Sequence, residues 1–229
     1  MTPHILATSI MSLFEIFKQG GFFMVLLLIC SVVSIMVMIL RGLALRRGVV
    51  LPKAIQQEIE NMPPGDNTET IVKLARLVRG DESALARVAQ VCLQHLQWPK
   101  AENVEAVQTK ARHEIVHLES GLFILEIIVG IAPLLGLLGA VSGLVIVFAD
   151  FSKSAESDSH VIAKGISEAL TTTIVGIAVA IPSLIAYSYF TKKVETMAAD
   201  METLIADLVA KCYFQKKRRE VRSEVYEGL

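Results

Sequence analysis

The sequence has few cysteines, few aromatic residues and no excess of charge of either sign. Its three cysteines, Cys30, Cys92 and Cys212, lie far apart and form no C-x-x-C pair, which excludes a disulfide scaffold and a cysteine-based zinc site. We expect them to be reduced and buried. Lys and Arg number 22 against 23 Asp and Glu, so the chain has no global positive field for binding nucleic acid.

The short motifs of common enzyme classes are absent as well. The chain contains no G-x-G-x-x-G or Walker loop, no H-E-x-x-H and no G-x-S-x-G. Its five histidines are scattered, and the pair His113 and His117, one helical turn apart, lacks a third metal ligand. We therefore expect no enzyme activity, no catalytic residue, no bound cofactor and no metal.

What the chain does have is a large apolar content, gathered in three segments. Of its 229 residues, 53% are hydrophobic and 20% are charged. Residues 21–40 and 127–149 carry no charge, and residues 166–190 carry only Glu168. About 20 apolar residues in a helix cross a bilayer core. The sequence therefore predicts three transmembrane helices.

The distribution of basic residues predicts the orientation of these helices. Nineteen of the 22 Lys and Arg residues lie between the first and second spans or after the third. That side is expected to be cytoplasmic, with the N-terminus outside and the C-terminus inside. The first span is expected to remain as an anchor, because its apolar run exceeds the about 7–15 residues of a signal peptide and its arginines follow the run.

The order of segments follows from these spans and from helical stripes of apolar residues. No period-2 alternation occurs, so no sheet is predicted. A stripe from Val104 to Leu122 and another from Val194 to Leu208 predict that the second and third spans continue far into the cytoplasm, the former as one helix over 101–149. Asp81 is the expected N-cap of a cytoplasmic helix ending near Gln97. The predicted segments are a periplasmic amphipathic segment (1–20), the first span (21–40), a helical cytoplasmic loop (41–115), the second span with a cytoplasmic extension (116–150), a short periplasmic loop (151–162), the third span (163–190) and a cytoplasmic C-terminal helix with a basic tail (191–229).

Small residues and prolines recur inside the second and third spans. Gly136, Gly139 and Gly143 share one helix face, and Gly176 lies on a small-residue face of the third span. Small residues let helix backbones approach closely in lipid, so these glycines are predicted to pack helices together within one chain or between copies. Pro133 and Pro182 indicate either structural kinks or a flexible, water-lined segment. The basic run 216–219 either contacts anionic lipid headgroups or is solvated.

Glu168 is the residue in the spans that most needs explaining. A charged side chain deep in a bilayer costs about 2.5–3.5 kcal/mol on insertion scales. Thr172 lies one turn further on, and Thr171 and Thr173 extend a polar patch. A carboxylate followed by hydroxyls suits cation coordination or a proton relay, whereas the alternative is an interfacial Glu that reaches the outer surface.

Two segments here resemble a known family. Residues 132–143, APLLGLLGAVSG, resemble the AP-x-x-GL-x-GTV-x-G segment of the ExbB/TolQ/MotA proton-channel family. Residues 165–176, GISEALTTTIVG, with 180–182, AIP, resemble its GI-x-EAL-x-x-T-x-x-G…AIP segment. The likeness covers roughly 115–195 well and the first span loosely, and three spans indicate the ExbB/TolQ branch.

The resemblance implies an all-α membrane protein of the bacterial inner membrane, assembled as a homopentamer around a central pore. It implies a dimer of a single-span ExbD/TolR-like partner that carries the titrating Asp, and a TonB-like protein as a further partner. Proton-motive force would then drive work on the cell envelope. The ion path would be lined by Glu168 and Thr173, with Thr172 and the prolines Pro133 and Pro182 beside it. One position departs from the family, because Ala140 replaces a threonine hydroxyl. The missing oxygen weakens a dehydrated sodium site and favours H⁺.

Several functions remain open from the sequence. TonB-type energised import is the first expectation, and a Tol-like division motor or a specialised secretion or gliding motor are alternatives. A flagellar stator of the MotA branch is disfavoured, because that branch has four spans. A non-conducting oligomeric scaffold is the remaining possibility.

Overall fold

The structure is a computed structural model that describes residues 21–63, 68–151 and 159–227. Within these ranges every regular element is helical and no strand occurs, as predicted. Three helical stretches are long and apolar enough to cross a membrane: Gly21–Ala44, Leu122–Ala149 and Gly165–Phe214. The three predicted spans are thus confirmed as candidates by length and composition. The predicted segment 1–20, most of the loop 151–162 and the side chains of the basic run 216–219 lie outside the described part.

The chain divides into two compact units. The first unit holds the described residues of Met1–Arg41 and Gly121–Tyr189, and the second holds Gly42–Ser120 and Phe190–Leu229. Each unit therefore joins segments that are distant in sequence. The apolar spans belong to the first unit, and the charged helices to the second.

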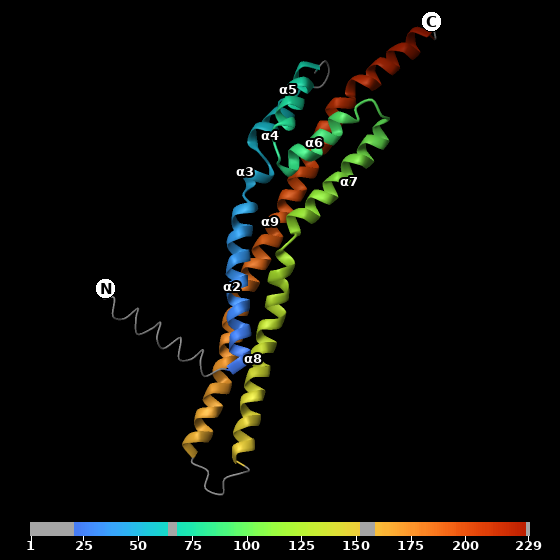
Figure 1. Cartoon of the computed structure of the whole chain (residues 1–229). Coiled ribbons are helices and arrows are strands. Elements are labelled where there is room, and N and C mark those ends of the chain that lie inside the picture. Colours follow the sequence, from blue (N-terminus) through green and yellow to red (C-terminus); the bar gives the residue numbers. More distant parts are fainter. Residues whose placement is uncertain (1–20, 64–67, 152–158, 228–229) are drawn as a thin grey trace, which may run out of the picture. The chain divides into compact units, whose positions relative to one another are not determined.

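Three helices make up the described part of the first unit, and Figure 1 shows them running along one another. They are α2 (Gly21–Ala44), α8 (Leu122–Phe151) and the first part of α9 (Ser159–Glu227). Their shared core holds Leu27 of α2, Ile128 and Ala132 of α8, and Ala180 of α9. Each helix thus contributes one or two residues to this core, while most large apolar side chains of these helices are exposed.

The second unit is built from short helices packed beside the remainder of α9. These are α3 (Arg47–Val50), α4 (Lys53–Glu60), α5 (Thr68–Arg79), α6 (Ala84–Gln94) and α7 (Lys100–Glu119). The predicted stripe on α9 is buried here, and it comprises Val194, Met197, Met201, Leu204 and Leu208. This burial confirms that the stripe packs helix on helix.

The prediction of one helix over 101–149 is wrong. The structure ends α7 at Glu119 and begins α8 at Leu122. Gly121 between them has a φ of +84°, in the left-handed region that glycine adopts without strain. The Arg41 guanidinium also lies against the space that a Gly121 side chain would fill. The positive φ of Gly121, together with the Arg41 side chain that packs against it, interrupts the helix at this point.

The predicted N-cap of α6 is also corrected. Ser83, not Asp81, caps the helix, because its Oγ accepts a hydrogen bond from the backbone N–H of Ala86 at 3.2 Å. Asp81 instead accepts a hydrogen bond from the Ser83 backbone N–H at 2.7 Å. The carboxylate therefore fixes the turn that presents the capping serine. The helix ends at Gln94 rather than near Gln97.

Candidate functional site

Two of the spans come into backbone contact where Gly136 of α8 meets Gly176 of α9. A methyl group added at Gly176 would lie 2.6 Å from the carbonyl oxygen of Ala132 and 3.1 Å from the Cα of Gly136. One added at Gly136 would lie 2.9 Å from the carbonyl oxygen of Thr172. These obstacles are backbone atoms, so only glycine on both helices permits this separation.

Further along α8, two more glycines face α9. A methyl group at Gly139 would lie 3.2 Å from both the Cβ and the Oγ1 of Thr172, and 3.2 Å from the Cβ of Phe23 on α2. At Gly143 the nearest atom would be the Cβ of Ala169, at an ordinary 3.5 Å. The structure therefore places all four glycines singled out in the sequence at one helix–helix contact, which loosens from Gly136 toward Gly143.

The hydroxyls and the carboxylate of α9 lie beside this contact and differ in their accessibility. Thr172 is buried, and its Oγ1 donates to the Ala169 carbonyl oxygen at 2.7 Å. Thr173 is half-buried, and its Oγ1 donates across the helix pair to the Gly136 carbonyl oxygen at a long 3.4 Å. Glu168 is half-buried at the edge of the same face, and Ala140 is buried on α8. Thr172 is thus engaged in intrachain packing, whereas Thr173 and Glu168 keep access from outside the chain.

The two prolines lie within unbroken helices. Pro133 is inside α8 and Pro182 is inside α9. Pro133 is half-buried and Pro182 is exposed on the single chain. Each lacks the amide hydrogen that would bond four residues back, which leaves a backbone carbonyl available for water or a partner.

A polar contact that sequence reasoning missed joins α2 to α9. Ser34 and Ser183 share a hydrogen bond of 2.6 Å between their hydroxyls, and both side chains are buried. Ser183 also donates to the Val179 carbonyl oxygen at 2.7 Å. The only signal in the sequence is the presence of a few serines within each apolar run, which by themselves do not indicate pairing.

Large apolar side chains cover the outward faces of α8 and α9. Leu134, Val145 and Ile174 are each about six-tenths exposed, at 59%, 61% and 65%. Exposed apolar faces of this extent on two adjacent helices are typical of surfaces that contact lipid or another protein chain. The packed glycine seam is therefore internal to the chain, and these outward faces are available for lipid or other copies.

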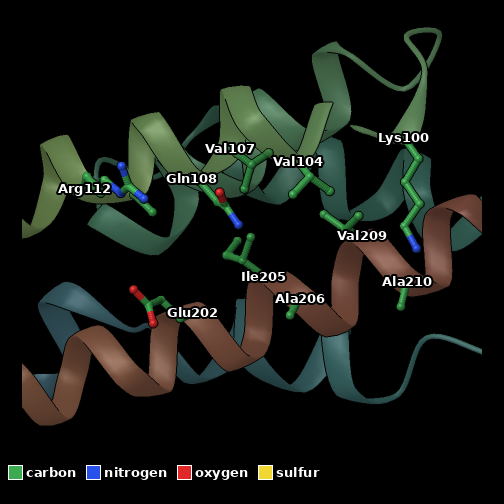
Figure 2. A pocket seen from close by; sticks show the side chains of 11 residues that line it. Lys100, Val104, Val107, Gln108, Arg112, Glu202, Ile205, Ala206, Val209 and Ala210 are labelled. Carbon is green, nitrogen blue, oxygen red and sulfur yellow. The ribbon is translucent and has the colours of Figure 1, made fainter. Parts of the chain in front are cut away.

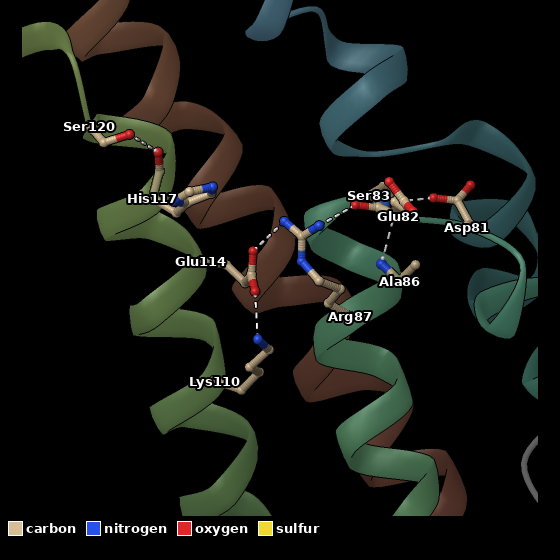
Figure 3. A network of polar contacts seen from close by, with 9 residues as sticks. All are labelled: Asp81, Glu82, Ser83, Ala86, Arg87, Lys110, Glu114, His117 and Ser120. Atoms are coloured by element: carbon tan, nitrogen blue, oxygen red, sulfur yellow. Dashed lines mark hydrogen bonds and ion pairs between the residues drawn. The ribbon is translucent and has the colours of Figure 1, made fainter.

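The second unit contains a buried carboxylate that links α6 to α7 (Figure 3). Glu114 accepts a hydrogen bond from Arg87 at 2.5 Å and pairs with Lys110 at 2.7 Å. Arg87 also donates to the Glu82 carbonyl oxygen. Burial by itself would raise the pKa of Glu114, but the hydrogen bonds from Arg87 and Lys110 outweigh it and lower that pKa. The hydrogen bond to Glu114 likewise raises the pKa of Arg87. The pair stays charged while it fastens the two helices.

A second buried network holds α9 against the end of α6. Asn103 is fully buried, and its Nδ2 donates to the Cys92 carbonyl oxygen at 3.0 Å and to the Tyr213 hydroxyl at 2.9 Å. The Tyr213 hydroxyl in turn lies 3.2 Å from the His95 carbonyl oxygen and 3.0 Å from that of Trp98. This network satisfies carbonyls at the C-terminal end of α6 that the helix itself leaves unpaired.

A groove of about 480 Å³ runs between α7 and α9 in the second unit. Figure 2 shows apolar side chains along its walls, among them Val104, Ile205 and Val209, with Lys100 toward one end and Glu202 toward the other. Among its lining residues there is no Ser, Cys or His to act as a nucleophile or base. The groove is a largely apolar recess between two helices, with charged side chains at its ends.

Comparison with known sequences identifies the family. Residues 81–203, just over half of the chain, match the MotA/TolQ/ExbB proton channel family. This chain belongs to that family. The matched region runs from the turn before α6 into α9 and so includes the Gly136–Gly176 contact. The family is one of channels, which agrees with the expectation that the protein is not an enzyme.

Individual relatives are biopolymer transport proteins. The chain is 42% identical over 81 residues to ExbB of Helicobacter pylori, an alignment covering 35% of this chain and 56% of that protein. It is 29% identical over 175 residues to exbB1 of Vibrio cholerae, covering 76% of each. It is 25% identical over 225 residues to ExbB of Neisseria meningitidis, covering 90% of this chain and 99% of that protein. The similarity to ExbB proteins thus extends over nearly the full chain.

Proposed function

We propose that this protein is the channel-forming stator subunit of an ion-driven motor in the bacterial inner membrane. The motor couples proton-motive force to work on the cell envelope, with TonB-type energised import as its process. This proposal rests on the match to the proton channel family, which extends from α6 into α9. The matched region includes Glu168, the only acidic residue in the apolar part of α9.

The chain acts as one of five copies around a lumen, together with a dimer of a single-span ExbD/TolR-like partner and a TonB-like protein. The apolar outward faces of α8 and α9 support an assembly in which they contact other copies and lipid. As the resemblance to the family implies, the partner supplies the titrating Asp, and the apolar spans of this chain carry none. The distribution of Lys and Arg supports a periplasmic N-terminus and a cytoplasmic C-terminus.

Within this assembly, Glu168 and Thr173 line the ion path. Both keep access from outside the single chain, and Thr173 contributes only a long hydrogen bond to packing. We also assigned Thr172 to the ion path. Because its hydroxyl is buried against α8, Thr172 positions the residues that line the path and does not line it itself. Pro133 and Pro182 each free a backbone carbonyl toward the path. A ring of five carboxylates favours cations.

The ion is H⁺. A dehydrated Na⁺ needs several oxygen ligands at once, and Ala140 offers none where the family has a hydroxyl. A proton requires only water and one acceptor at a time. The half-buried Glu168 therefore suffices as the fixed acceptor of a water-mediated relay.

Two measurements test this function. Native mass spectrometry of the detergent-purified complex, with and without a co-expressed single-span partner, is expected to show a pentamer that gains two partner copies. In liposomes loaded with a pH-sensitive dye, Glu168→Gln is expected to reduce proton flux several-fold, whereas Glu126→Gln, an exposed glutamate on α8, leaves it unchanged. A monomer or dimer that ignores the partner, or equal flux in both variants, would favour a non-conducting scaffold.

A further inference from the structure

The groove between α7 and α9 consists of an apolar floor between two rims. The floor is made of buried residues from both helices: Val107, Ala111, Ile205 and Val209. Its rim on α7 is a row of residues spaced four apart that begins at Lys100 and ends at Arg112, since such residues lie one above the other on a helix. At each level the floor is only one residue of each helix wide. The groove is therefore long and narrow.

Small side chains on α9 leave this groove open. The rim of α9 carries Ala206 and Ala210, both exposed, at positions where a longer side chain would cover the floor. The resulting space of about 480 Å³ lies within the roughly 300–1,000 Å³ of small-molecule sites, which are mostly apolar and have a few polar groups that orient the ligand. The groove therefore has the size and the lining of a site for a small amphiphilic molecule.

The two ends of the groove differ in net charge. Figure 2 shows Arg112 and Glu202 at one end, on opposite rims, so that this end carries charges of both signs. At the other end the side chain of Lys100 extends toward α9 near Ala210. Within the described ranges, the Lys100 side chain takes part in no ion pair or hydrogen bond. Among the lining residues, a net positive charge therefore lies only at the Lys100 end.

We propose that this groove binds a saturated fatty acid, with the carboxylate at Lys100 and the hydrocarbon chain along the apolar floor. The carboxylate accepts hydrogen bonds from the Lys100 ammonium group, and the chain leaves water to contact the side chains of Val107 and Ile205. The narrow floor has width for one chain, which favours a single-chain amphiphile over a phospholipid with two. This inference does not depend on the proposed function, because it concerns only the second unit.

The length of the groove limits the length of the chain that it can bury. Lys100 and Arg112 are 12 residues apart in α7, which corresponds to about 18 Å at about 1.5 Å per residue. Carbon–carbon bonds of about 1.5 Å advance an extended chain by roughly 1.3 Å per carbon. A chain of about 12 carbons, roughly 15 Å long, therefore covers the floor and leaves space for the charged side chains. Longer chains extend past the Arg112 end and bury no further methylene groups there.

The experiment measures binding to the full chain through its single tryptophan. Trp98 lies two residues before Lys100 and is 43% exposed, so its fluorescence reports the occupancy of that end. The protein is transferred from detergent into an amphipathic polymer, which removes the free micelles that would take up fatty acid. Dodecanoate brominated beside the carboxylate is expected to quench Trp98 more strongly than dodecanoate brominated at its terminal carbon, because bromine quenches only at short range.

Unlabelled fatty acids of increasing length then displace the brominated probe. Affinity is expected to rise about four-fold for each added methylene group up to about 12 carbons, and then to level off. Matched variants separate the groove from unspecific association. Lys100→Gln is expected to weaken dodecanoate binding about ten-fold or more, but to leave binding of uncharged dodecanol unchanged. Ala206→Leu fills the groove and is expected to weaken binding of both about ten-fold or more. Ala101→Leu changes an exposed alanine of α7 outside the groove and is expected to bind like wild type.

Three results would overturn the proposal. The first is an affinity that keeps rising with chain length beyond the groove, as partition into the polymer would produce. The second is equal quenching by the two brominated acids, or equal binding by the two leucine variants. The third is an absence of quenching in the wild type at every chain length, which would mean that another copy of the chain or a partner helix covers the groove in the purified protein.

Discussion

Gly176→Ala tests whether backbone contact between α8 and α9 sets the stability of the membrane-spanning unit. The added methyl would lie 2.6 Å from the Ala132 carbonyl oxygen. Carbon and carbonyl oxygen ordinarily meet no closer than about 3.3–3.6 Å, so the helices must separate by roughly 0.7 Å or more. Overpacking of this kind costs about 1–3 kcal/mol, and rigid backbone obstacles place this case at the upper end. Alanine returns up to about 1 kcal/mol through its helix propensity.

We therefore expect Gly176→Ala to lower the free energy of unfolding by about 2 kcal/mol. The matched control is Gly130→Ala on α8, where a methyl group would meet nothing within 4 Å. That variant is expected to be neutral or more stable by up to about 1 kcal/mol. The two substitutions are chemically identical, so the difference of about 3 kcal/mol between them reports only the helix contact.

The assay is unfolding of the purified chain in mixed micelles by increasing mole fraction of dodecyl sulfate, followed by far-ultraviolet circular dichroism. Gly136→Ala should fall close to Gly176→Ala, because its nearest obstacle is also backbone, at 2.9 Å. Gly143→Ala should resemble the control, since its nearest atom lies at 3.5 Å. If Gly176→Ala unfolds like wild type, or if Gly143→Ala is equally destabilised, distance to the opposing helix does not govern stability and the reasoning fails.

Three further predictions concern single contacts. The hydrogen bonds from Arg87 and Lys110 lower the pKa of Glu114, so the ionised carboxylate stabilises the second unit above its ordinary pKa of 4.5. This stabilisation is lost as the pH falls through the lower pKa of the folded state. Glu114→Gln should therefore reduce the drop in melting temperature at acid pH, and it should lower the free energy of unfolding by about 1–3 kcal/mol at pH 7. Gly121→Ala should lower the melting temperature, because a positive φ costs alanine about 1–2 kcal/mol and its methyl displaces Arg41, and an unchanged melt would argue against the observed break. For the hydrogen bond between Ser34 and Ser183, a double-mutant cycle with alanine should give a coupling of about 0.6–1.7 kcal/mol, whereas additive effects would mean the hydroxyls act separately.

The parts of the structure that were predictable are those encoded by many residues at once. Three runs of apolar residues specify the spans, and the stripe from Val194 to Leu208 specifies the buried face of α9. The glycine face of α8 was predictable for the same reason, because several small residues repeat at helical spacing. Because each of these patterns repeats over several residues, the prediction does not depend on any single residue.

Features that depend on a single residue were missed or misplaced. The helix break rests on Gly121 alone, and glycine inside an apolar helix is common in membranes. Asn103 and Glu114 are buried on α7, beside Val107 and Ala111, and each has a hydrogen-bond partner that lies 11 or 27 residues away. A polar residue with a distant partner looks solvent-exposed in sequence. Which α9 hydroxyl faces outward is likewise decided by packing against Gly139 and not by spacing.

The second unit is built from two segments that lie far apart in the sequence, and this limits the order in which its helices can pack during synthesis. Asn103 and Tyr213 lie 110 residues apart, and Lys211, whose Nζ binds the Ile59 carbonyl oxygen at 2.9 Å, lies 152 residues from that partner. At a synthesis rate of about 5–20 residues per second, the earlier segment waits roughly 6–30 s for the later one. During that interval both intervening spans must enter the membrane. Helices α4 to α7 therefore stay incompletely packed on the nascent chain, and their final closure around α9 follows only after the third span has been correctly inserted.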